Sequence, residues 1–418
     1  MRPRAEPFTG GERQAAAELE ALLRSAVGQQ MIADVPLGAF LSGGVDSSTV
    51  VAIMQAQSSR PVRTFTIGFN EAGYNEAEHA KAIARHLGTD HTELYVTSHE
   101  AMEVVPLLPR MYDEPFADSS QIPTFLVSQL ARQQVTVSLS GGGGHELFGG
   151  YTRYSVGPRL SRHIRPLPRP VRRTVGSLLD LVGAVRWNSV AAGADRLFGP
   201  GTAPPRLGEK ISKLAAVMRS GGNGPGLLYK SMVSASRTPS DLVVGGHEPA
   251  TLIDGASELP DVGGFAQTMM YLDALTYLPD DIMAKVDRAS MACSLESRAP
   301  FLDHRVVEFA WRLPLDMKVR GGTSKWILRQ VLYRHVPPSL IERPKTGFSI
   351  PVGAWLRGPL REWAGDLLAE RRLGEDGFLD VAVVRRVWDE HQSGRYDWEL
   401  VLSAILMFQS WLEAERQQ

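Results

Sequence analysis

Short apolar runs alternate with amphipathic segments along the N-terminal third of the chain. The apolar runs that predict strands are 35–41, 63–69, 92–97 and 133–140. The segments with apolar residues at helical spacing are 11–34, 48–57, 75–88 and 125–133. Strands that alternate with helices in this way predict an α/β fold with a doubly wound, mostly parallel sheet. Ligands of such sheets bind beyond the carboxyl ends of the strands, so the loops after 35–41 and 133–140 are candidate sites.

The remainder of the chain lacks this alternation. Residues 155–265 are predicted to form a mostly helical, partly flexible insertion, because 159–173 is basic and broken by prolines and 221–226 reads GGNGPG. The basic run favours a solvated face, with an anion or partner site as the alternative. Helical spacing then returns and predicts helices packed beside the sheet. The expected regions are an N-terminal helix at 1–34, a sheet core at 35–154, the insertion at 155–265 and a helical remainder at 266–418.

Composition excludes several classes of function. The chain has 45 basic and 46 acidic residues, a formal net charge of −1, so no overall field attracts nucleic acid or an anionic membrane. The single cysteine, Cys293, excludes an internal disulfide and a cysteine-based zinc site. No apolar run approaches the roughly 20 residues of a membrane span, and no signal-peptide core follows the first charges. We therefore expect a soluble, cytoplasmic protein without nucleic-acid or membrane partners.

The loop LSGGVDSS at 41–48 lies between a predicted strand and a predicted helix. This is the context that a phosphate cradle requires, because the helix N-terminus attracts anions. Gly43 and Gly44 allow the backbone N–H groups to approach an anion, and Ser42 and Ser47 add hydroxyl donors. The alternative is a glycine turn that binds nothing, and the Asp and Ser-Ser that follow at this spacing argue against it.

Asp46 distinguishes this loop from other phosphate loops. A carboxylate beside a polyphosphate repels it unless a cation lies between them, so Asp46 predicts a bridging Mg²⁺. The Lys-Ser/Thr ending of a loop for phosphoryl transfer is missing. The pattern SGGxDS instead resembles the PP-loop of the ATP pyrophosphatases, which transfer AMP to a substrate and release pyrophosphate. ATP and Mg²⁺ are therefore the expected cofactors.

Six ordered motifs extend the resemblance over roughly 12–415. They are DVPLGAFLSGGVDSS, TFTIGF, YDEPFADSSQIPT, SLSGGGGHELFGGY, YLPDDIMAKVDRASMACSLESRAPFLDHRVVEFAWRLP and SKWILR. In this order they resemble the synthetase domain of glutamine-dependent asparagine synthetases. The resemblance implies that the aspartate side-chain carboxylate reacts with ATP to give β-aspartyl-AMP and pyrophosphate, after which ammonia displaces AMP.

The resemblance also implies roles for individual residues. The positions that match ATP- and pyrophosphate-binding residues are Phe40, Leu41, Ser42, Gly43, Gly44, Asp46, Ser47, Ile67, Ser140 and Gly141. Asp46 would hold the metal. Lys325 matches a family lysine that neutralises charge on the α-phosphate as pyrophosphate leaves, which agrees with the general advantage of a positioned cation in a transition state. Without the resemblance, Lys325 would be interpreted as a helix-surface lysine.

The second glycine-rich loop, residues 140–146, reads SGGGGHE. It departs from the family pattern S-G-[D/E]-G-x-D-E. Gly142 and His145 occupy the positions of two family acids, so two carboxylates are absent. The first acid assists formation of the adenylate and attack by ammonia, and such help is worth roughly 10²–10⁴-fold in rate. The second helps to hold Mg²⁺, for which imidazole is a poor ligand. Glu146 remains, one residue further along the turn. We expect ATP binding with slow amide formation.

Four further residues are candidates for substrate binding: Asp118, Ser119, Asp281 and Arg288. The last two belong to a dense charged segment, 281–298, that suggests a buried network. That network is expected either to line an aspartate pocket or, more often in proteins, to brace helices against the sheet. For Asp118 and Ser119 the alternative is capping of the next helix.

The residues leave the source of ammonia and the exact reaction open. Glutaminase domains of this family begin with a cysteine nucleophile, but position 2 is Arg and Cys293 lies far along the chain. We therefore expect no glutaminase domain here, an opening helix that resembles the family's inter-domain linker, and ammonia from a separate domain or chain. The alternatives are adenylation of another carboxylate, such as a peptide or a β-amino acid that closes a lactam, and a pseudoenzyme that only binds nucleotide. A homo-oligomer is compatible with the sequence.

Overall fold

The computed structural model describes residues 6–69, 76–164, 166–199, 207–219, 225–236, 238–254, 259–343 and 350–417. Two compact units share the chain. The first comprises Met1–Ser155, Met270–Ile350 and Ala414–Gln418, and the second Val156–Met269 and Pro351–Glu413. The expected region 266–418 is thus divided between the units. Positions 221–224 of the predicted GGNGPG turn lie outside the described residues.

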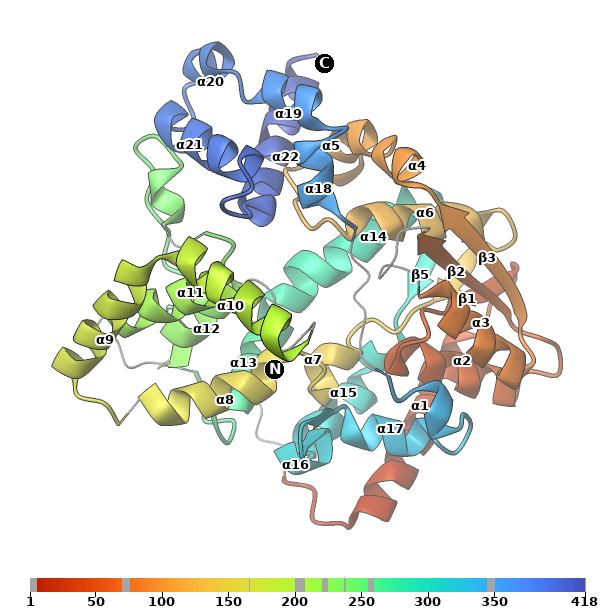
Figure 1. The fold of residues 1–418 in the computed structure, drawn as a ribbon. Helices are drawn as coiled ribbons and strands as arrows, with labels where there is room; N and C mark the ends of the chain where they lie inside the picture. The colour runs from red at the N-terminus through yellow and green to blue at the C-terminus, as the bar shows by residue number, and fades with distance from the viewer. Residues whose placement is uncertain are drawn as a thin grey trace. The chain divides into compact units, whose positions relative to one another are not determined.

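A five-stranded parallel sheet forms the centre of the first unit (Figure 1). Its strands are β1 Leu37–Phe40, β2 Arg63–Phe69, β3 Asp90–Val96, β4 Val137–Leu139 and β5 Glu296–Arg298. Their order is β3-β2-β1-β4-β5, and every neighbouring pair is parallel. This confirms the predicted doubly wound α/β fold. The order reverses between β1 and β4, the point at which such sheets bind ligands.

The strands differ from their predictions in two ways. β4 is shorter than the predicted run 133–140, because residues 133–134 extend α6 as a turn and Ser140 already begins the next loop. β5 was not predicted, since Glu296–Arg298 is a three-residue polar edge strand without any apolar run. Its register is set by β4, with Val137 opposite Glu296 and Leu139 opposite Arg298. Edge pairing of this kind depends on the partner strand rather than on local sequence.

Helices surround the sheet of the first unit. They are α1 Glu12–Gln30, α2 Val45–Gln57, α3 Ala77–Leu87, α4 Ser98–Met102, α5 Leu108–Tyr112, α6 Gln121–Arg132, α7 Gly144–Phe148, α14 Ala284–Met291, α15 His304–Arg312, α16 Leu315–Lys318 and α17 Trp326–Leu332. The short helical turns are Val105–Leu107, the π-helical Leu278–Met283, Pro300–Leu302 and Pro338–Leu340. A two-stranded antiparallel hairpin, β6 Val319–Arg320 and β7 Thr323–Ser324, precedes α17.

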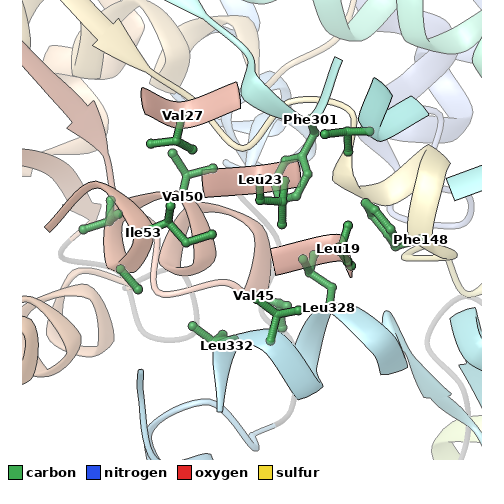
Figure 2. Packing of buried hydrophobic residues seen from close by; sticks show 14 of the residues in the cluster. Leu19, Leu23, Val27, Val45, Val50, Ile53, Phe148, Phe301, Leu328 and Leu332 are labelled. Carbon is green, nitrogen blue, oxygen red and sulfur yellow. The ribbon is translucent and has the colours of Figure 1, made fainter. Parts of the chain in front are cut away.

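The main hydrophobic core lies where α1, α2, α15 and α17 pack together. Figure 2 shows Leu19 and Leu23 of α1 facing Val50 of α2 and Leu328 of α17. These side chains are at most 1% exposed. Complete burial of an aliphatic side chain is worth roughly 1.5–3 kcal/mol. The core therefore fixes the start of α2 and the start of α17, both of which carry polar residues of the site described below.

The second unit is helical. Its helices are α9 Arg169–Val182, α10 Ala184–Phe198, α11 Leu207–Arg219, α12 Pro225–Val233, α18 Val352–Arg357, α19 Arg361–Leu367, α20 Glu370–Asp376 and α21 Val381–Gln392, with a turn at Pro239–Asp241. Three helices cross the unit boundaries: α8 Arg153–Ile164, α13 Phe265–Leu275 and α22 Glu399–Arg416. Leu242 packs on a core formed by α18–α22, which joins the C-terminal helices to the insertion. Among the described residues no helix is long and apolar enough to cross a membrane.

Candidate nucleotide site

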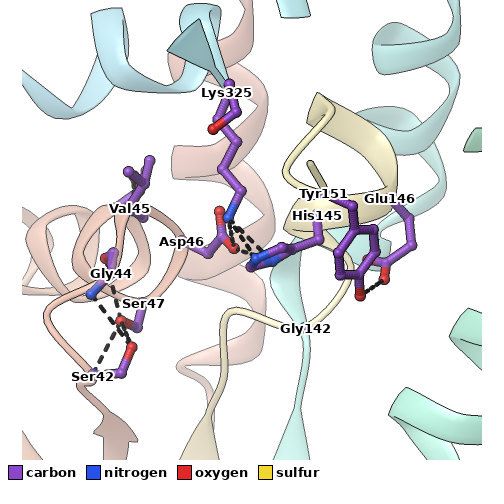
Figure 3. A network of polar contacts seen from close by, with 12 residues as sticks. Ser42, Gly44, Val45, Asp46, Ser47, Gly142, His145, Glu146, Tyr151 and Lys325 are labelled. Atoms are coloured by element: carbon purple, nitrogen blue, oxygen red, sulfur yellow. Dashed lines mark hydrogen bonds and ion pairs between the residues drawn. The ribbon is translucent and has the colours of Figure 1, made fainter. Parts of the chain in front are cut away.

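The loop from Leu41 to Gly44 connects β1 to α2 and is held in shape by its own side chains. The Ser42 backbone N–H donates to the Ser47 Oγ at 3.1 Å, and the two hydroxyl oxygens are 2.9 Å apart (Figure 3). Gly43 has φ +71°, a left-handed conformation that favours glycine. The loop leads directly into the N-terminus of α2. A polar turn of this shape at a helix N-terminus is suited to binding an anion.

The second loop, after β4, meets the first one. A Cβ atom on Gly141 would lie 2.8 Å from the Ser47 backbone nitrogen and 2.9 Å from the Asp46 Cβ, so only glycine permits this approach. Ser140, which precedes Gly141, is 8% exposed. The loops that follow β1 and β4 therefore come together at the switch point of the sheet, as the sequence predicts.

Asp46 lies in the first turn of α2 and forms a buried charge cluster with two residues from other elements (Figure 3). Its Oδ2 is 2.5 Å from the Lys325 Nζ and 2.9 Å from the His145 Nδ1. The Lys325 Nζ is also 3.1 Å from the His145 Nδ1. Burial by itself raises the pKa of the Asp46 carboxyl, but Lys325 and His145 outweigh it and hold this pKa well below its usual range. Asp46 is therefore ionised at neutral pH.

Lys325 does not lie on the surface of a helix. α17 begins at Trp326, and Lys325 caps it in a left-handed conformation with φ +57°. Lys325 is 6% exposed, and its Cε passes the backbone of Gly150 so closely that a Cβ there would be 2.3 Å away. The tight turn after β7 thus directs the ammonium group inward to Asp46.

A cavity of about 410 Å³ opens beside this cluster. Of the predicted site residues it is lined by Phe40, Leu41, Ser42, Gly43, Gly44, Asp46, Ser47, Ile67, Ser140, His145 and Lys325. Gly141 packs against Ser47 and Asp46 of the first loop and does not line the cavity. Gly142 does not line the cavity either. The lining also includes polar residues that were not among the predicted site residues: Thr66, Glu76, Thr124, Ser324, Arg329 and Arg343. Thr66, Thr124, Ser324 and Arg329 stand inside the six motifs, which could have identified them, whereas Glu76 and Arg343 lie outside those motifs.

Comparison with known proteins identifies the family. A family model described as "Asparagine synthase" matches residues 18–413. The chain belongs to the asparagine synthase family. It is 34% identical over 415 residues to "Putative asparagine synthetase (glutamine-hydrolyzing)" of Mycobacterium tuberculosis (strain ATCC 25618 / H37Rv), which covers 97% of this chain and 59% of the relative.

Two further relatives show the range of the similarity. "Asparagine synthetase (glutamine-hydrolyzing) 1" of Bacillus subtilis (strain 168) is 30% identical over 402 residues, covering 94% of this chain and 58% of the relative. "Amidase chyE" of Penicillium rubens is 24% identical over 396 residues, covering 86% of this chain and 56% of the relative. The chain thus spans less than two thirds of the length of each of these relatives.

The position of the first missing acid of the asparagine synthase loop has room for a side chain. A Cβ atom on Gly142 would lie 3.7 Å from the Ala299 Cβ and 3.7 Å from the Met283 Sδ, which are ordinary contacts. Glu146 does not replace the missing acids. It is 1% exposed and accepts a hydrogen bond from the Tyr151 hydroxyl at 2.6 Å (Figure 3). Glu146 does not line the cavity. Burial raises the pKa of Glu146, although the Tyr151 hydrogen bond lowers it.

The substrate candidates lie outside the lining of this cavity. Asp118 is 2.5 Å from the Lys285 Nζ and accepts from Ser120 through its other oxygen, while Asp281 lies 3.9 Å from the same Nζ. Arg288 forms a solvent-exposed ion pair with Asp113 at 2.8 Å.

Ser119 contributes its carbonyl to the start of α6, through a hydrogen bond from the Ile122 N–H at 3.3 Å. The predicted single buried network over 281–298 is wrong for Asp287, Arg288 and Glu296, whose side chains are exposed. Only the part around Lys285 is buried, and it joins α14 to α6.

The chemistry of the donors fits a magnesium ion held together with phosphates. The Asp46 Oδ1 is buried and has no hydrogen-bond partner among the described residues, while its Oδ2 contacts both the Lys325 ammonium and the His145 imidazole. Within the same described ranges no group of three or more His, Cys, Asp or Glu side chains could hold a metal by itself. Mg²⁺ typically uses one or two carboxylates and takes its remaining ligands from water and substrate phosphates. Asp46 satisfies that requirement.

Proposed function

We propose that this chain is the amide-forming part of an ATP-dependent ligase of the asparagine synthetase type. In the first step the aspartate side-chain carboxylate attacks the α-phosphate of ATP, giving β-aspartyl-AMP and pyrophosphate. In the second step ammonia from a separate glutaminase domain or chain attacks the acyl carbon and releases AMP. The observation that carries this proposal is the convergence of both glycine-rich loops, Asp46 and Lys325 on one cavity.

Each residue of the cluster has a distinct task in this proposal. The first loop offers its backbone N–H groups and the Ser42 and Ser47 hydroxyls to the β- and γ-phosphates. Phe40 and Ile67 line the part of the cavity assigned to adenosine. The Lys325 ammonium stabilises the negative charge that grows on the α-phosphate region as pyrophosphate leaves. Asp46 would hold Mg²⁺, which when bound neutralises part of the triphosphate charge.

A second candidate function follows from the changed loop. With glycine at 142 and histidine at 145, no side chain replaces the family acid that assists the acyl transfer. This favours either slow amide formation or a protein that binds nucleotide without turnover. Adenylation of a carboxylate other than aspartate is a third candidate, and the similarity to a relative named "Amidase chyE" is compatible with it.

Exchange of radioactive pyrophosphate into ATP distinguishes the three candidates, because it reports reversible adenylation without the need for ammonia. Exchange that requires aspartate supports the asparagine-synthetase reaction. Exchange that appears only with another acid of a panel supports a different acceptor. Binding of ATP with no exchange for any acid supports the pseudoenzyme. If the chain does not bind ATP with millimolar Mg²⁺ present, the proposal of a nucleotide site is wrong.

A further inference from the structure

Three long cationic side chains line the cavity, and they differ in what neutralises them. Lys325 is paired with Asp46 at 2.5 Å. Arg329 is paired with Glu342. For Arg343 the described residues provide no carboxylate within ion-pair distance. A cation that is left without an anion while it faces a cavity is a natural site for an anionic ligand.

The position of Arg343 relates it directly to the first loop. Its Nη2 donates to the Gly43 carbonyl at 3.2 Å and lies 3.1 Å from the place where a Gly43 Cβ would be. Burial lowers the pKa of the guanidinium, while nearby Glu76 raises it. The loop therefore has a cation at each end, with Arg343 at Gly43 and Lys325 at Asp46.

We propose that Arg343 is a second phosphate-binding residue, which holds the pyrophosphate portion of ATP at the Gly43 end of the loop. This inference rests on the proposed function of the site. Two properties of arginine suit it to this task. A guanidinium presents paired N–H donors that match two phosphate oxygens, which a lysine cannot do. A guanidinium also keeps its charge throughout the physiological pH range. It therefore stabilises the pyrophosphate group both before and after the bond between the α- and β-phosphates breaks.

If Arg343 holds the pyrophosphate portion of ATP, its loss should affect the binding of that portion and leave the binding of the AMP portion nearly unchanged. Pyrophosphate carries several negative charges, and the neutral backbone donors of the loop do not compensate them. AMP carries its adenosine toward Phe40 and Ile67 and retains a single phosphate, so it depends little on a cation at Gly43. Loss of Arg343 should therefore weaken binding of pyrophosphate much more than binding of AMP.

The test measures the affinities of inorganic pyrophosphate and of AMP for the full chain by titration calorimetry with Mg²⁺ present. The variants are Arg343→Ala and Arg343→Lys. The control is Arg85→Ala, because Arg85 is an exposed arginine on neighbouring α3 and does not line the cavity. We expect Arg343→Ala to weaken pyrophosphate binding by roughly 10- to 100-fold, with AMP changed less than about twofold. Arg343→Lys should give an intermediate loss, and it keeps the test decisive if the alanine variant is unstable.

Three results would lead to other conclusions. If both Arg343 variants bind pyrophosphate as well as Arg85→Ala does, the inference is wrong and the proposed nucleotide site stands. If pyrophosphate and AMP weaken by the same factor, Arg343 only supports the loop through the Gly43 carbonyl, and the inference is again wrong. If the unmodified chain binds neither pyrophosphate nor ATP, the proposed function itself fails.

Discussion

Lys318 provides a quantitative test of the electrostatics of this fold. It ends α16, is 1% exposed, and has no anionic partner in the described part of the chain. Its ammonium lies 5.0 Å from the centre of the Trp311 ring, a contact that offsets only part of the cost of removing a charge from water. Burial lowers the pKa of Lys318 from 10.5 to about 7. We predict that Lys318→Met stabilises the first unit.

The size of this effect follows from linkage. Between pH 7 and 10.5 the unfolded chain holds a proton on Lys318 that the folded chain has largely lost, so stability of the unmodified protein rises with pH. At about 1.4 kcal/mol for each pH unit, this amounts to a cost on the order of 4 kcal/mol at pH 7 that declines toward zero near pH 10.5. Methionine has a similar volume and no charge, so it removes the cost without opening a cavity.

Urea unfolding at pH 7 and at pH 9.5 measures both the sign and the pH dependence. Lys318→Met should unfold at a higher urea concentration than the unmodified protein at pH 7, and the gap should narrow at pH 9.5. Lys81→Met is the control, because the Lys81 side chain is 43% exposed and its ion pair with Glu93 lies at the surface, where such pairs contribute little to stability. A Lys318→Met variant that is no more stable than the unmodified protein at pH 7, or a gap that is the same at both pH values, would show that the charge of Lys318 does not carry this cost.

Three further predictions concern the site. The double variant Gly142→Asp with His145→Asp should raise aspartate-dependent ATP–pyrophosphate exchange by roughly 10²-fold, because Gly142 has space for a side chain, and unchanged exchange would contradict the assigned roles. Gly150→Ala should reduce exchange, because its Cβ would displace the Lys325 Cε and the His145 backbone. Gly365→Ala, where nothing lies within 4 Å, should leave exchange unchanged. Lys325→Met should lower the rate of exchange by roughly 10²–10³-fold while ATP affinity, measured by calorimetry, changes far less, and an equal loss in both would show that Lys325 serves mainly in binding.

The sequence predicted the parts of this structure that depend on local pattern. The strands and helices up to residue 139 alternate in periodicity, and each of the two glycine-rich loops follows a strand, so the meeting of Asp46 and Ser140 follows from topology alone. β5 could not be predicted in the same way, because its three polar residues become a strand only beside β4. The hydrophobic pattern therefore predicts the strands and helices with strong periodicity, but it does not predict polar segments such as β5 that become strands only beside a partner.

Burial and pairing could not be predicted from local pattern. Lys325 stands in a motif that reads as helix, and its inward direction depends on a left-handed turn and on the absence of a side chain at Gly150. Arg343 lies about 300 positions from Gly43 along the chain. Arg288 and Lys285 come from one charged segment, but one is exposed and the other is buried. Contacts between residues far apart in the sequence decide whether each of these side chains is buried and what it pairs with. Such contacts cannot be predicted from a short stretch of one sequence.

Position 145 carries histidine where the family pattern has an acid. This replacement changes the charge around the proposed metal as well as one of its possible ligands. An aspartate at 145 would place a second carboxylate beside Asp46, so that Lys325 would balance one of two negative charges and the other would attract Mg²⁺. With histidine, Lys325 and the imidazole both bind the Asp46 Oδ2, and only the Oδ1 remains available. A dication approaching this oxygen is repelled by the ammonium group that pairs with the same carboxylate. The hydrogen bonds between Ser42 and Ser47 that shape the first loop do not involve position 145. We therefore expect the substitution to weaken the proposed metal site and acyl transfer more than the proposed nucleotide binding.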